Sequence, residues 1–369
     1  MKPSFKHAMR VAAQLTAGGG LQAATAAIQK ALAGEAAVPS TLKATWSGTP
    51  RSVRRAGTSP GETDIIDVQG RWVDDLPSES EAGNEAGSTL AGTFGNAAGS
   101  RDYLLYLPPA IGKSAQAPAL VIMLHGCTQT PADFAAGTAM NALADRHGFA
   151  VLYPGQSQAA NQSACWNWFN PADQRAEAGE PSIIVGMARE VIAGHGIDSR
   201  RIFVAGLSAG GAMAAILADT YPDLVAAVAV HSGLPSGAAH DLPSALAAMK
   251  RGGAARTTAK RKAMRTIVFH GRQDRTVHPA NGAQIAAAAL AAWPPRALSV
   301  RHETDRSPGG RSYTRTIHAD AGGRPMVEVW DVQGAGHAWS GGSALGSYTD
   351  PKGPDASAAM IDFFLAHRN

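Results

Sequence analysis

The segment Gly206-Leu207-Ser208-Ala209-Gly210 constrains the fold more than any other part of this sequence. It follows an apolar run at 201–205 and precedes an alanine-rich run at 211–219 that is typical of a helix. A Gly-x-Ser-x-Gly pentapeptide between a buried strand and a helix predicts a sharp turn that presents the serine hydroxyl above the sheet edge. The turn needs flanking residues without bulky side chains, which the two glycines supply. Ser208 is therefore a candidate nucleophile.

A second match to the same pattern shows that the pentapeptide needs its context. Gly57-Thr58-Ser59-Pro60-Gly61 lies in a polar stretch, with no predicted strand before it and no predicted helix after it. The chain has 41 glycines in 369 residues, so matches by chance are expected. The interpretation of Ser208 therefore depends on partner residues elsewhere in the chain.

The acid and the base that such a serine requires are expected downstream, in that order. The β-rich run 266–269 leads into His270-Gly271-Arg272-Gln273-Asp274, which puts Asp274 just beyond a predicted strand. His337 lies in a glycine-rich loop after 326–332, where alternating apolar and polar residues predict a strand at the sheet edge. We predict that His337 takes the serine proton and that Asp274 fixes its tautomer.

Other readings exist for the residues around this acid. Asp274 could be a turn residue or a helix cap, and either role is compatible with catalysis. His270 and His278 flank it too closely in sequence to lie opposite it across the nucleophile. We interpret both histidines as structural or supporting residues.

Two backbone N–H donors are expected to bind the oxyanion of a tetrahedral intermediate. One belongs to Ala209, the residue after the nucleophile. The other should lie in the loop after an early buried strand, and His125-Gly126-Cys127-Thr128-Gln129 follows the apolar run 119–124. Gly126 allows close approach of the backbone to the substrate, and the N–H of Cys127 or of Thr128 is the expected donor.

The motifs at 124–127, 206–210, 270–274 and 336–339, with Cys165-Trp166-Asn167-Trp168-Phe169 between the first and the second, together resemble polyhydroxybutyrate depolymerase-type esterases. These are related to feruloyl and acetylxylan esterases. The similarity runs from about Gly92 to the C-terminus. The resemblance implies an α/β-hydrolase fold and a serine esterase without a cofactor that hydrolyses short-chain polyhydroxyalkanoate or its oligomers. The alternatives are a feruloyl or acetylxylan esterase and a granule- or surface-binding scaffold.

The resemblance also places Cys127 and Cys165 in loops at the rim of the active site and implies that they form a disulfide. Two free, buried thiols in a reducing cytoplasm are the alternative. Trp166 and Trp339 lie near the motifs and are expected to line the substrate pocket, because aromatic walls suit an apolar group. Ordinary core packing is the alternative for both tryptophans.

The same family resemblance indicates an extracellular protein, with the cytoplasm as the alternative. Residues 1–34 carry a basic start but lack the compact apolar core of a signal peptide. Their apolar positions at helical spacing predict a short helical segment, which could dock on the catalytic domain, on a partner or on a polymer granule. A surface helix without a role is the alternative. No polymer-binding module is expected after the last predicted helix, 357–367.

Three regions follow from the composition and the hydrophobic pattern. After the helical segment 1–34, residues 35–87 are rich in Gly, Ser, Pro, Thr and charge and are expected to be a flexible linker. Residues 88–369 alternate strands and helices, which predicts a mostly parallel sheet with helices on both faces. The strands are expected at 101–107, 119–124, 149–153, 201–205, 226–231, 266–269 and 326–332, and the helices at 133–146, 182–193, 210–220 and 282–293.

Several classes of partner are not expected. The net charge is only +4, and the basic cluster at 250–265 has no interleaved aromatic residues, so we interpret it as a solvated loop rather than a nucleic-acid site. The sequence contains no run of 18 or more apolar residues, so no membrane span is expected. No phosphate loop, His-Glu-x-x-His or Cys-x-x-Cys motif occurs, so neither a nucleotide nor a metal is expected.

Overall fold

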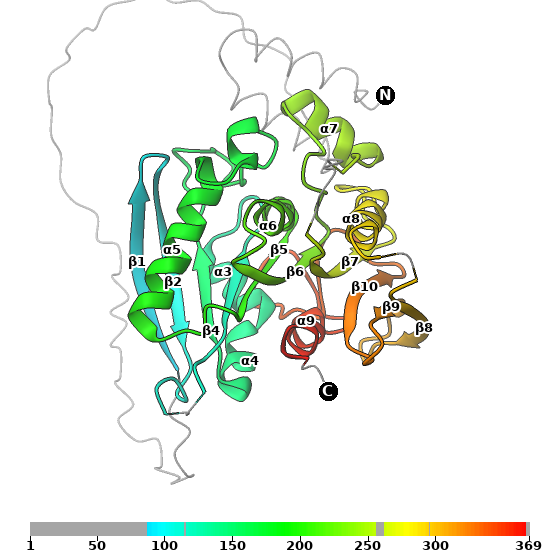
Figure 1. Ribbon diagram of the computed structural model, residues 1–369. Coiled ribbons are helices and arrows are strands. Elements are labelled where there is room, and N and C mark those ends of the chain that lie inside the picture. Colours follow the sequence, from blue (N-terminus) through cyan, green and yellow to red (C-terminus); the bar gives the residue numbers. More distant parts are fainter. Residues whose placement is uncertain (1–86, 114–115, 256–261, 295, 367–369) are drawn as a thin grey trace, which may run out of the picture. The chain divides into compact units, whose positions relative to one another are not determined.

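The computed structural model describes residues 87–113, 116–255, 262–294 and 296–366 (Figure 1). The helical segment expected at 1–34 lies outside these ranges, as does all but the last residue of the expected linker 35–87. The first described strand, β1, begins at Ser88.

A ten-stranded sheet with the order β1-β2-β4-β3-β5-β6-β7-β10-β9-β8 runs through the described residues. Its central strands, from β4 to β10 in this order, pair in parallel, and β1, β2, β8 and β9 add antiparallel pairings at the two ends. The parallel centre confirms the predicted class. The strands are β1 (Ser88–Asn96), β2 (Gly99–Leu107), β3 (Leu120–Leu124), β4 (Ala150–Pro154), β5 (Ile202–Leu207), β6 (Val225–His231), β7 (Arg265–Gly271), β8 (Ser299–Arg306), β9 (Ser312–Ala319) and β10 (Pro325–Val332).

Helices cover both faces of this sheet (Figure 1). One face carries α5 (Gly179–His195), α6 (Ala209–Thr220), α7 (Leu242–Arg251) and α8 (Ala280–Ala291), and the other carries α3 (Pro131–Thr138), α4 (Met140–His147) and α9 (Ala356–Leu365). A short 3₁₀-helix, Pro171–Gln174, and a small sheet of β11 (Trp339–Ser340) and β12 (Thr349–Asp350) complete the described elements.

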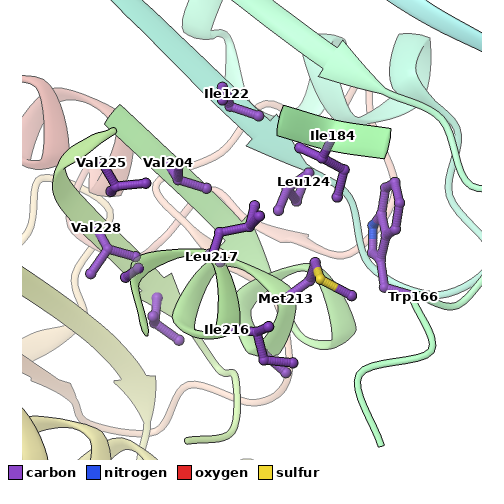
Figure 2. Packing of buried hydrophobic residues seen from close by; sticks show 14 of the residues in the cluster. Ile122, Leu124, Trp166, Ile184, Val204, Met213, Ile216, Leu217, Val225 and Val228 are labelled. Atoms are coloured by element: carbon purple, nitrogen blue, oxygen red, sulfur yellow. The ribbon is translucent and has the colours of Figure 1, made fainter. Parts of the chain in front are cut away.

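The continuous apolar run of β3 supplies side chains to both cores, because successive side chains of a strand point to opposite faces. Ile122 and Leu124 belong to the core beneath α5 and α6, whereas Val121 and Met123 belong to the core beneath α3, α4 and α9. Figure 2 shows the first core, with Leu217 of α6 facing the strands. Burial on both faces holds the carboxyl ends of the central strands in fixed positions.

The helix expected at 133–146 is interrupted at Ala139, which has a left-handed backbone with φ 51° and separates α3 from α4. The reason lies far away in sequence. The carbonyl of Gly137 accepts the N–H of Ser343 (2.8 Å), and the carbonyl of Thr138 accepts the hydroxyl of Ser357 (2.6 Å). The C-terminal segment therefore takes the carbonyls that a continuous helix would use.

The strand expected at 326–332 was predicted at the sheet edge, and this placement is wrong. β10 lies between β7 and β9, and the hairpin of β8 and β9 lies outside it. The alternating apolar and polar residues of β10 suggested a strand with one solvated face. Glu328 is instead buried and pairs with Arg315 of β9 at 2.8 Å. A polar residue in a strand therefore does not require a solvated face when a neighbouring strand supplies its partner.

The basic cluster at 250–265 is only partly a solvated loop, and residues 256–261 lie outside the described ranges. Arg265 is the first residue of β7 and is buried, with its guanidinium donating to the carbonyls of Phe363 and Phe364. Burial lowers the pKa of Arg265 to about 10, and the charge of Arg324 adds to this effect.

Across the described ranges, every helix is too short or too polar to cross a lipid bilayer.

Candidate active site

Ser208 stands at the turn between β5 and α6 with the strained backbone that such a turn requires. Its φ is 58° and its ψ is −119°, a conformation that residues with a side chain rarely adopt. The glycines on either side are needed for packing: a Cβ on Gly206 would overlap the Gly210 carbonyl, and one on Gly210 would overlap the Leu124 carbonyl. The local sequence thus places the Ser208 hydroxyl at the carboxyl end of the sheet and at the N-terminus of α6.

Asp274 and His337 lie close together, although 62 residues separate them in the sequence (from 275 to 336). The Nδ1 atom of His337 donates to Oδ2 of Asp274 at 2.7 Å. The other carboxylate oxygen, Oδ1, accepts the backbone N–H groups of Thr276 (2.9 Å) and Val277 (2.8 Å). With Nδ1 acting as a donor, Nε2 of His337 is left as the ring nitrogen that can accept a proton.

The environment of Asp274 keeps it ionised. Burial would raise its pKa, but hydrogen bonds and charges from His270 and His337 outweigh burial and hold the pKa below its ordinary value. His270 is buried, with its Nε2 atom 3.5 Å from Oδ2 of Asp274 and 2.8 Å from the carbonyl of Val277. This position fits the supporting role expected for His270. His278 instead contacts the start of α8, where its Nδ1 accepts the N–H of Ala280 at 3.1 Å.

The structure joins two of the three predicted catalytic residues directly. Among the described residues, the hydrogen bonds include the one between His337 and Asp274 but none between His337 and the Ser208 hydroxyl. The link from His337 to Ser208 therefore stays a prediction. Ser208 is 8% exposed, so its hydroxyl lies in a recess rather than on an open surface.

The loop after β3 packs directly against the nucleophile turn. A Cβ built on Gly126 would lie 3.5 Å from the Ser208 Cβ. The backbone N–H of Thr128 donates to the Ser163 carbonyl at 2.7 Å, so it has another acceptor. Of the two expected donors in this loop, Cys127 is therefore the one that remains for an oxyanion, together with Ala209.

Several hydrogen bonds hold the peptide that joins Gly126 to Cys127. The Gly126 carbonyl accepts Nδ1–H of His125 (2.7 Å) and the N–H of Gln129 (3.3 Å). His125 is buried, its Nε2 accepts the N–H of Gln156 (3.0 Å), and burial lowers its pKa, so it stays neutral. Because the carbonyl and N–H of a trans peptide point in opposite directions, fixing the Gly126 carbonyl also fixes the direction of the Cys127 N–H.

Cys127 and Cys165 form a disulfide, as the resemblance implied. The bond joins the loop after β3 to the segment that carries Trp168 and Phe169. The two loops that surround Ser208 are therefore covalently connected.

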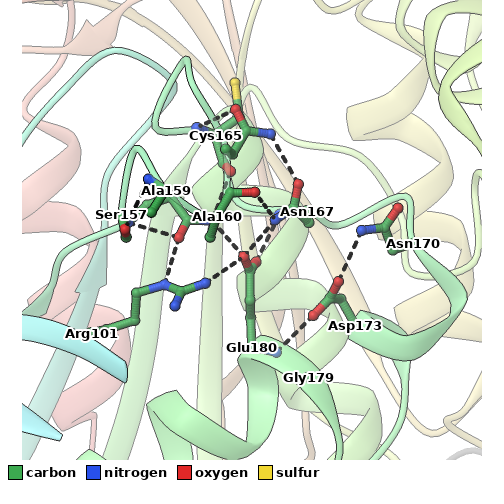
Figure 3. A network of polar contacts seen from close by, with 12 residues as sticks. Arg101, Ser157, Ala159, Ala160, Cys165, Asn167, Asn170, Asp173, Gly179 and Glu180 are labelled. Carbon is green, nitrogen blue, oxygen red and sulfur yellow. Dashed lines mark hydrogen bonds and ion pairs between the residues drawn. The ribbon is translucent and has the colours of Figure 1, made fainter. Parts of the chain in front are cut away.

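A buried polar network holds the second of these loops (Figure 3). Glu180, at the start of α5, accepts the backbone N–H (2.7 Å) and the side-chain amide (2.8 Å) of Asn167. It also pairs with Arg101 (3.2 Å) and accepts the amide of Gln156 (2.5 Å). Gln156 in turn donates to the Cys165 carbonyl (2.8 Å). The network connects Arg101 of β2 to the disulfide at Cys165 and to the ring of His125.

A pocket that is partly open to solvent begins at the candidate nucleophile. Ser208, Ala209 and Cys127 all line it, so the structure brings the predicted nucleophile and both predicted oxyanion donors to one recess. The remaining lining residues are mostly apolar and include Trp168 and Phe169.

The expectation that Trp166 and Trp339 line the pocket is wrong, because both are core residues with 0% and 1% exposure. The indole of Trp166 points into the core and donates to the His125 carbonyl at 3.1 Å (Figure 2). Trp339 lies on the opposite face of the sheet, where it stacks on His231 and donates to the Ser357 hydroxyl. Proximity to a motif in the sequence does not decide on which side of a loop a ring lies.

One wall of the pocket is formed by α7, a helix that was not predicted from the sequence. Its pocket-facing residues are Leu242, Ala245, Leu246 and Met249. They follow the spacing of one helical face, and Asp241 caps the helix by accepting the N–H of Ser244 at 2.8 Å. Both signals are readable in the sequence and could have identified this helix.

Metal ligands are not clustered in the described residues: no group of three or more His, Cys, Asp or Glu side chains there could hold an ion.

Comparison with known proteins identifies the family. The profile described as Esterase PHB depolymerase matches residues 101–293, just over half of the chain. The chain belongs to the Esterase PHB depolymerase family. This confirms the resemblance on which the sequence-based predictions relied.

Two curated relatives of this esterase family member illustrate the range of similar proteins. Poly(3-hydroxyalkanoate) depolymerase C of Paucimonas lemoignei is 33% identical over 269 residues, which cover 68% of this chain and 61% of that protein. Feruloyl esterase B of Neurospora crassa is 39% identical over 123 residues, which cover 33% of this chain and 41% of that protein. The chain thus spans less than two thirds of the length of each of these relatives.

A solved structure supports the fold of this esterase family member. The acetyl xylan esterase from Aspergillus awamori aligns with a TM-score of 0.59 and 22% identity, covering 75% of this chain and 99% of that one. At this identity the likeness concerns the fold, and it confirms the predicted α/β-hydrolase fold.

Proposed function

We propose that this chain is a serine esterase that hydrolyses short-chain polyhydroxyalkanoate, such as polyhydroxybutyrate, or its oligomers through an acyl-enzyme. The observation that carries the proposal is the 2.7 Å hydrogen bond from His337 to the ionised Asp274, in a chain whose Ser208 has the backbone of a nucleophile turn. Family membership and the similarity to a depolymerase of Paucimonas lemoignei support the substrate class.

In the proposed reaction, Ser208 Oγ attacks the ester carbonyl carbon while Nε2 of His337 takes the hydroxyl proton. The backbone N–H groups of Cys127 and Ala209 bind the oxyanion of the tetrahedral intermediate. When the intermediate collapses, the C–O bond to the alcohol breaks and His337 returns the proton to the leaving alcohol. A water molecule, deprotonated by His337, then cleaves the acyl-enzyme and frees Ser208. Asp274 stabilises the imidazolium in both steps.

A second candidate is a feruloyl or acetylxylan esterase that acts on plant cell-wall esters with the same residues. The 39% identity to feruloyl esterase B of Neurospora crassa favours it. The two candidates differ in the substrate and not in the chemistry, so a panel of substrates separates them.

The experiment compares the wild type with Ser208→Ala. We expect the wild type to release soluble hydroxybutyrate from polyhydroxybutyrate or its oligomers, and the variant to release none above background. Methyl ferulate and acetylated xylan are tested in parallel. Faster hydrolysis of either of these would transfer the assignment to the second candidate, and equal activity of wild type and Ser208→Ala would exclude a serine esterase.

We further propose that the protein works outside the cell and that residues 1–34 dock on polymer granules. The disulfide between Cys127 and Cys165 supports an oxidising compartment, because such bonds are rare where thiols are kept reduced. Deletion of residues 1–34 tests docking, since a docking segment should lower binding to polymer granules without changing hydrolysis of a soluble ester. Unchanged binding would contradict it.

A further inference from the structure

The pocket beside Ser208 has a distinct wall formed by one face of α7. Leu242, Ala245, Leu246 and Met249 point into it at the spacing of successive helical turns. Across from the nucleophile turn, these side chains give the pocket an apolar lining.

The position of α7 is fixed by the loop that carries the proposed triad acid and by the start of α8. At the C-terminal end of α7, the Ala248 carbonyl accepts the side-chain amide of Asn281 (2.9 Å), and the Met249 carbonyl accepts the N–H of His278 (2.7 Å). In the same loop, Val277 lines the pocket and donates its N–H to Asp274. The apolar wall is therefore held at a fixed distance from the catalytic residues.

The pocket offers little to a charged group. None of the described lining residues is charged, and Asn161 is the one amide among them. Its oxygen is already engaged, because Oδ1 accepts the N–H groups of Ser163 (3.1 Å) and Cys165 (3.4 Å), and Nδ2 donates one hydrogen bond to Asn167 (2.9 Å). A carboxylate entering the pocket would lose its hydration without gaining a comparable set of partners.

The lining also decides which half of the ester occupies the pocket. Ser208 and both proposed oxyanion donors border it, so the carbonyl carbon sits at its entrance. His337, which would protonate the leaving alcohol, is not among the described residues that line it. The alcohol should therefore leave on the His337 side, and the acyl group should extend into the pocket.

We propose that this pocket is an acyl-binding site for uncharged acyl chains, and that Leu246 and Met249 of α7 set the chain length it accepts. The proposal rests on the proposed esterase function and names the half of the substrate that this site recognises.

The test is a series of p-nitrophenyl esters from acetate to decanoate, with p-nitrophenyl hemisuccinate as a charged analogue of the butyrate. For the wild type, kcat/KM should rise by about fourfold for each methylene added beyond acetate until the chain fills the pocket. The hemisuccinate should react roughly a hundredfold more slowly than the butyrate, since its carboxylate would be desolvated without a partner.

The variants Leu246→Trp and Met249→Trp each fill part of the pocket from α7. Each should lower the octanoate-to-acetate ratio of kcat/KM by about tenfold or more. Arg251→Trp adds the same indole at an exposed position of α7 and should leave the ratio unchanged. Two variants are used because Leu246 is buried and its replacement can impair folding, whereas Met249 is only half-buried.

The outcomes separate the two proposals. A folded wild type that hydrolyses no ester in the series would overturn the proposed function itself. Three results with an active wild type would overturn the acyl-site proposal and leave the esterase function standing. The wild type could show no dependence of kcat/KM on acyl length, or it could accept the hemisuccinate as well as the butyrate. The third result is an octanoate-to-acetate ratio of kcat/KM in Met249→Trp that equals that of the wild type.

Discussion

Replacing Asp274 by asparagine tests how the proposed triad acid acts on His337. In the wild type, Oδ1 of Asp274 accepts two backbone N–H groups, from Thr276 and Val277, and Oδ2 accepts Nδ1–H of His337. An asparagine amide keeps its oxygen toward the two backbone donors, because the opposite orientation would place its NH₂ against both of them. Its NH₂ group then faces Nδ1 of His337, which becomes an acceptor, and the ring proton moves to Nε2.

A histidine with its proton on Nε2 cannot take the proton of Ser208. We therefore expect kcat to fall by about 10⁴-fold, which corresponds to about 5.4 kcal/mol of transition-state stabilisation, with little change in KM. The assay is the initial rate of p-nitrophenyl butyrate hydrolysis at saturating substrate. A folded Asp274→Asn enzyme that loses less than tenfold would refute the tautomer argument.

The control for this variant is Asp355→Asn. Asp355 caps α9 by accepting the N–H of Ala358 at 2.9 Å, and asparagine caps helices about as well as aspartate. Its activity should stay within about twofold of the wild type. Far-UV circular dichroism of both variants shows whether the sheet and helices are intact.

The same substitution predicts a change in how stability depends on pH. The pKa of Asp274 in the folded protein is below the ordinary value of about 3.9. An acid with a lowered folded pKa stabilises the fold above its unfolded pKa, and this contribution is lost as the pH falls through the folded value. The free energy of unfolding should therefore decrease less steeply below about pH 4 in Asp274→Asn than in the wild type. Parallel acid unfolding curves would contradict this.

Three further predictions concern the framework of the site. Glu180→Gln should lower the free energy of unfolding by about 3–5 kcal/mol in urea denaturation, because it leaves a buried arginine without its carboxylate; an unchanged midpoint would argue against the network. Replacing Cys127 and Cys165 together by alanine should lower the free energy of unfolding by about 4 kcal/mol, since the disulfide closes a loop with a sequence separation of 38 residues. The double variant should also have a lower kcat, and full activity would show that the loops need no covalent link. Gly210→Ala should abolish activity or soluble expression, because the added Cβ overlaps the Leu124 carbonyl; a soluble, active variant would contradict the packing of the nucleophile turn.

Those parts of the protein that depend on local patterns of residues could be predicted from the amino-acid sequence. Apolar runs such as 119–124 and 201–205 predicted buried parallel strands, since a strand covered on both faces tolerates few polar residues. The glycines around Ser208 predicted the turn, because such a turn needs residues without bulky side chains, and an added Cβ at Gly206 or Gly210 would collide with neighbouring backbone. Strand-end positions also predicted that Asp274 and His337 lie close together, since parallel strands bring their carboxyl ends to one edge, and the two side chains are hydrogen-bonded.

The tertiary structure alone decided which side chains surround the site. Trp166 and Trp168 are two residues apart in one loop, yet the first is a core residue and the second lines the pocket. A loop has no fixed period, so its sequence does not say which side each residue faces. The Arg101–Glu180 pair and the break at Ala139 depend on partners 79 and about 200 residues away. Such contacts exist only once the chain has packed, because the burial and partners of a side chain are set by segments remote in sequence.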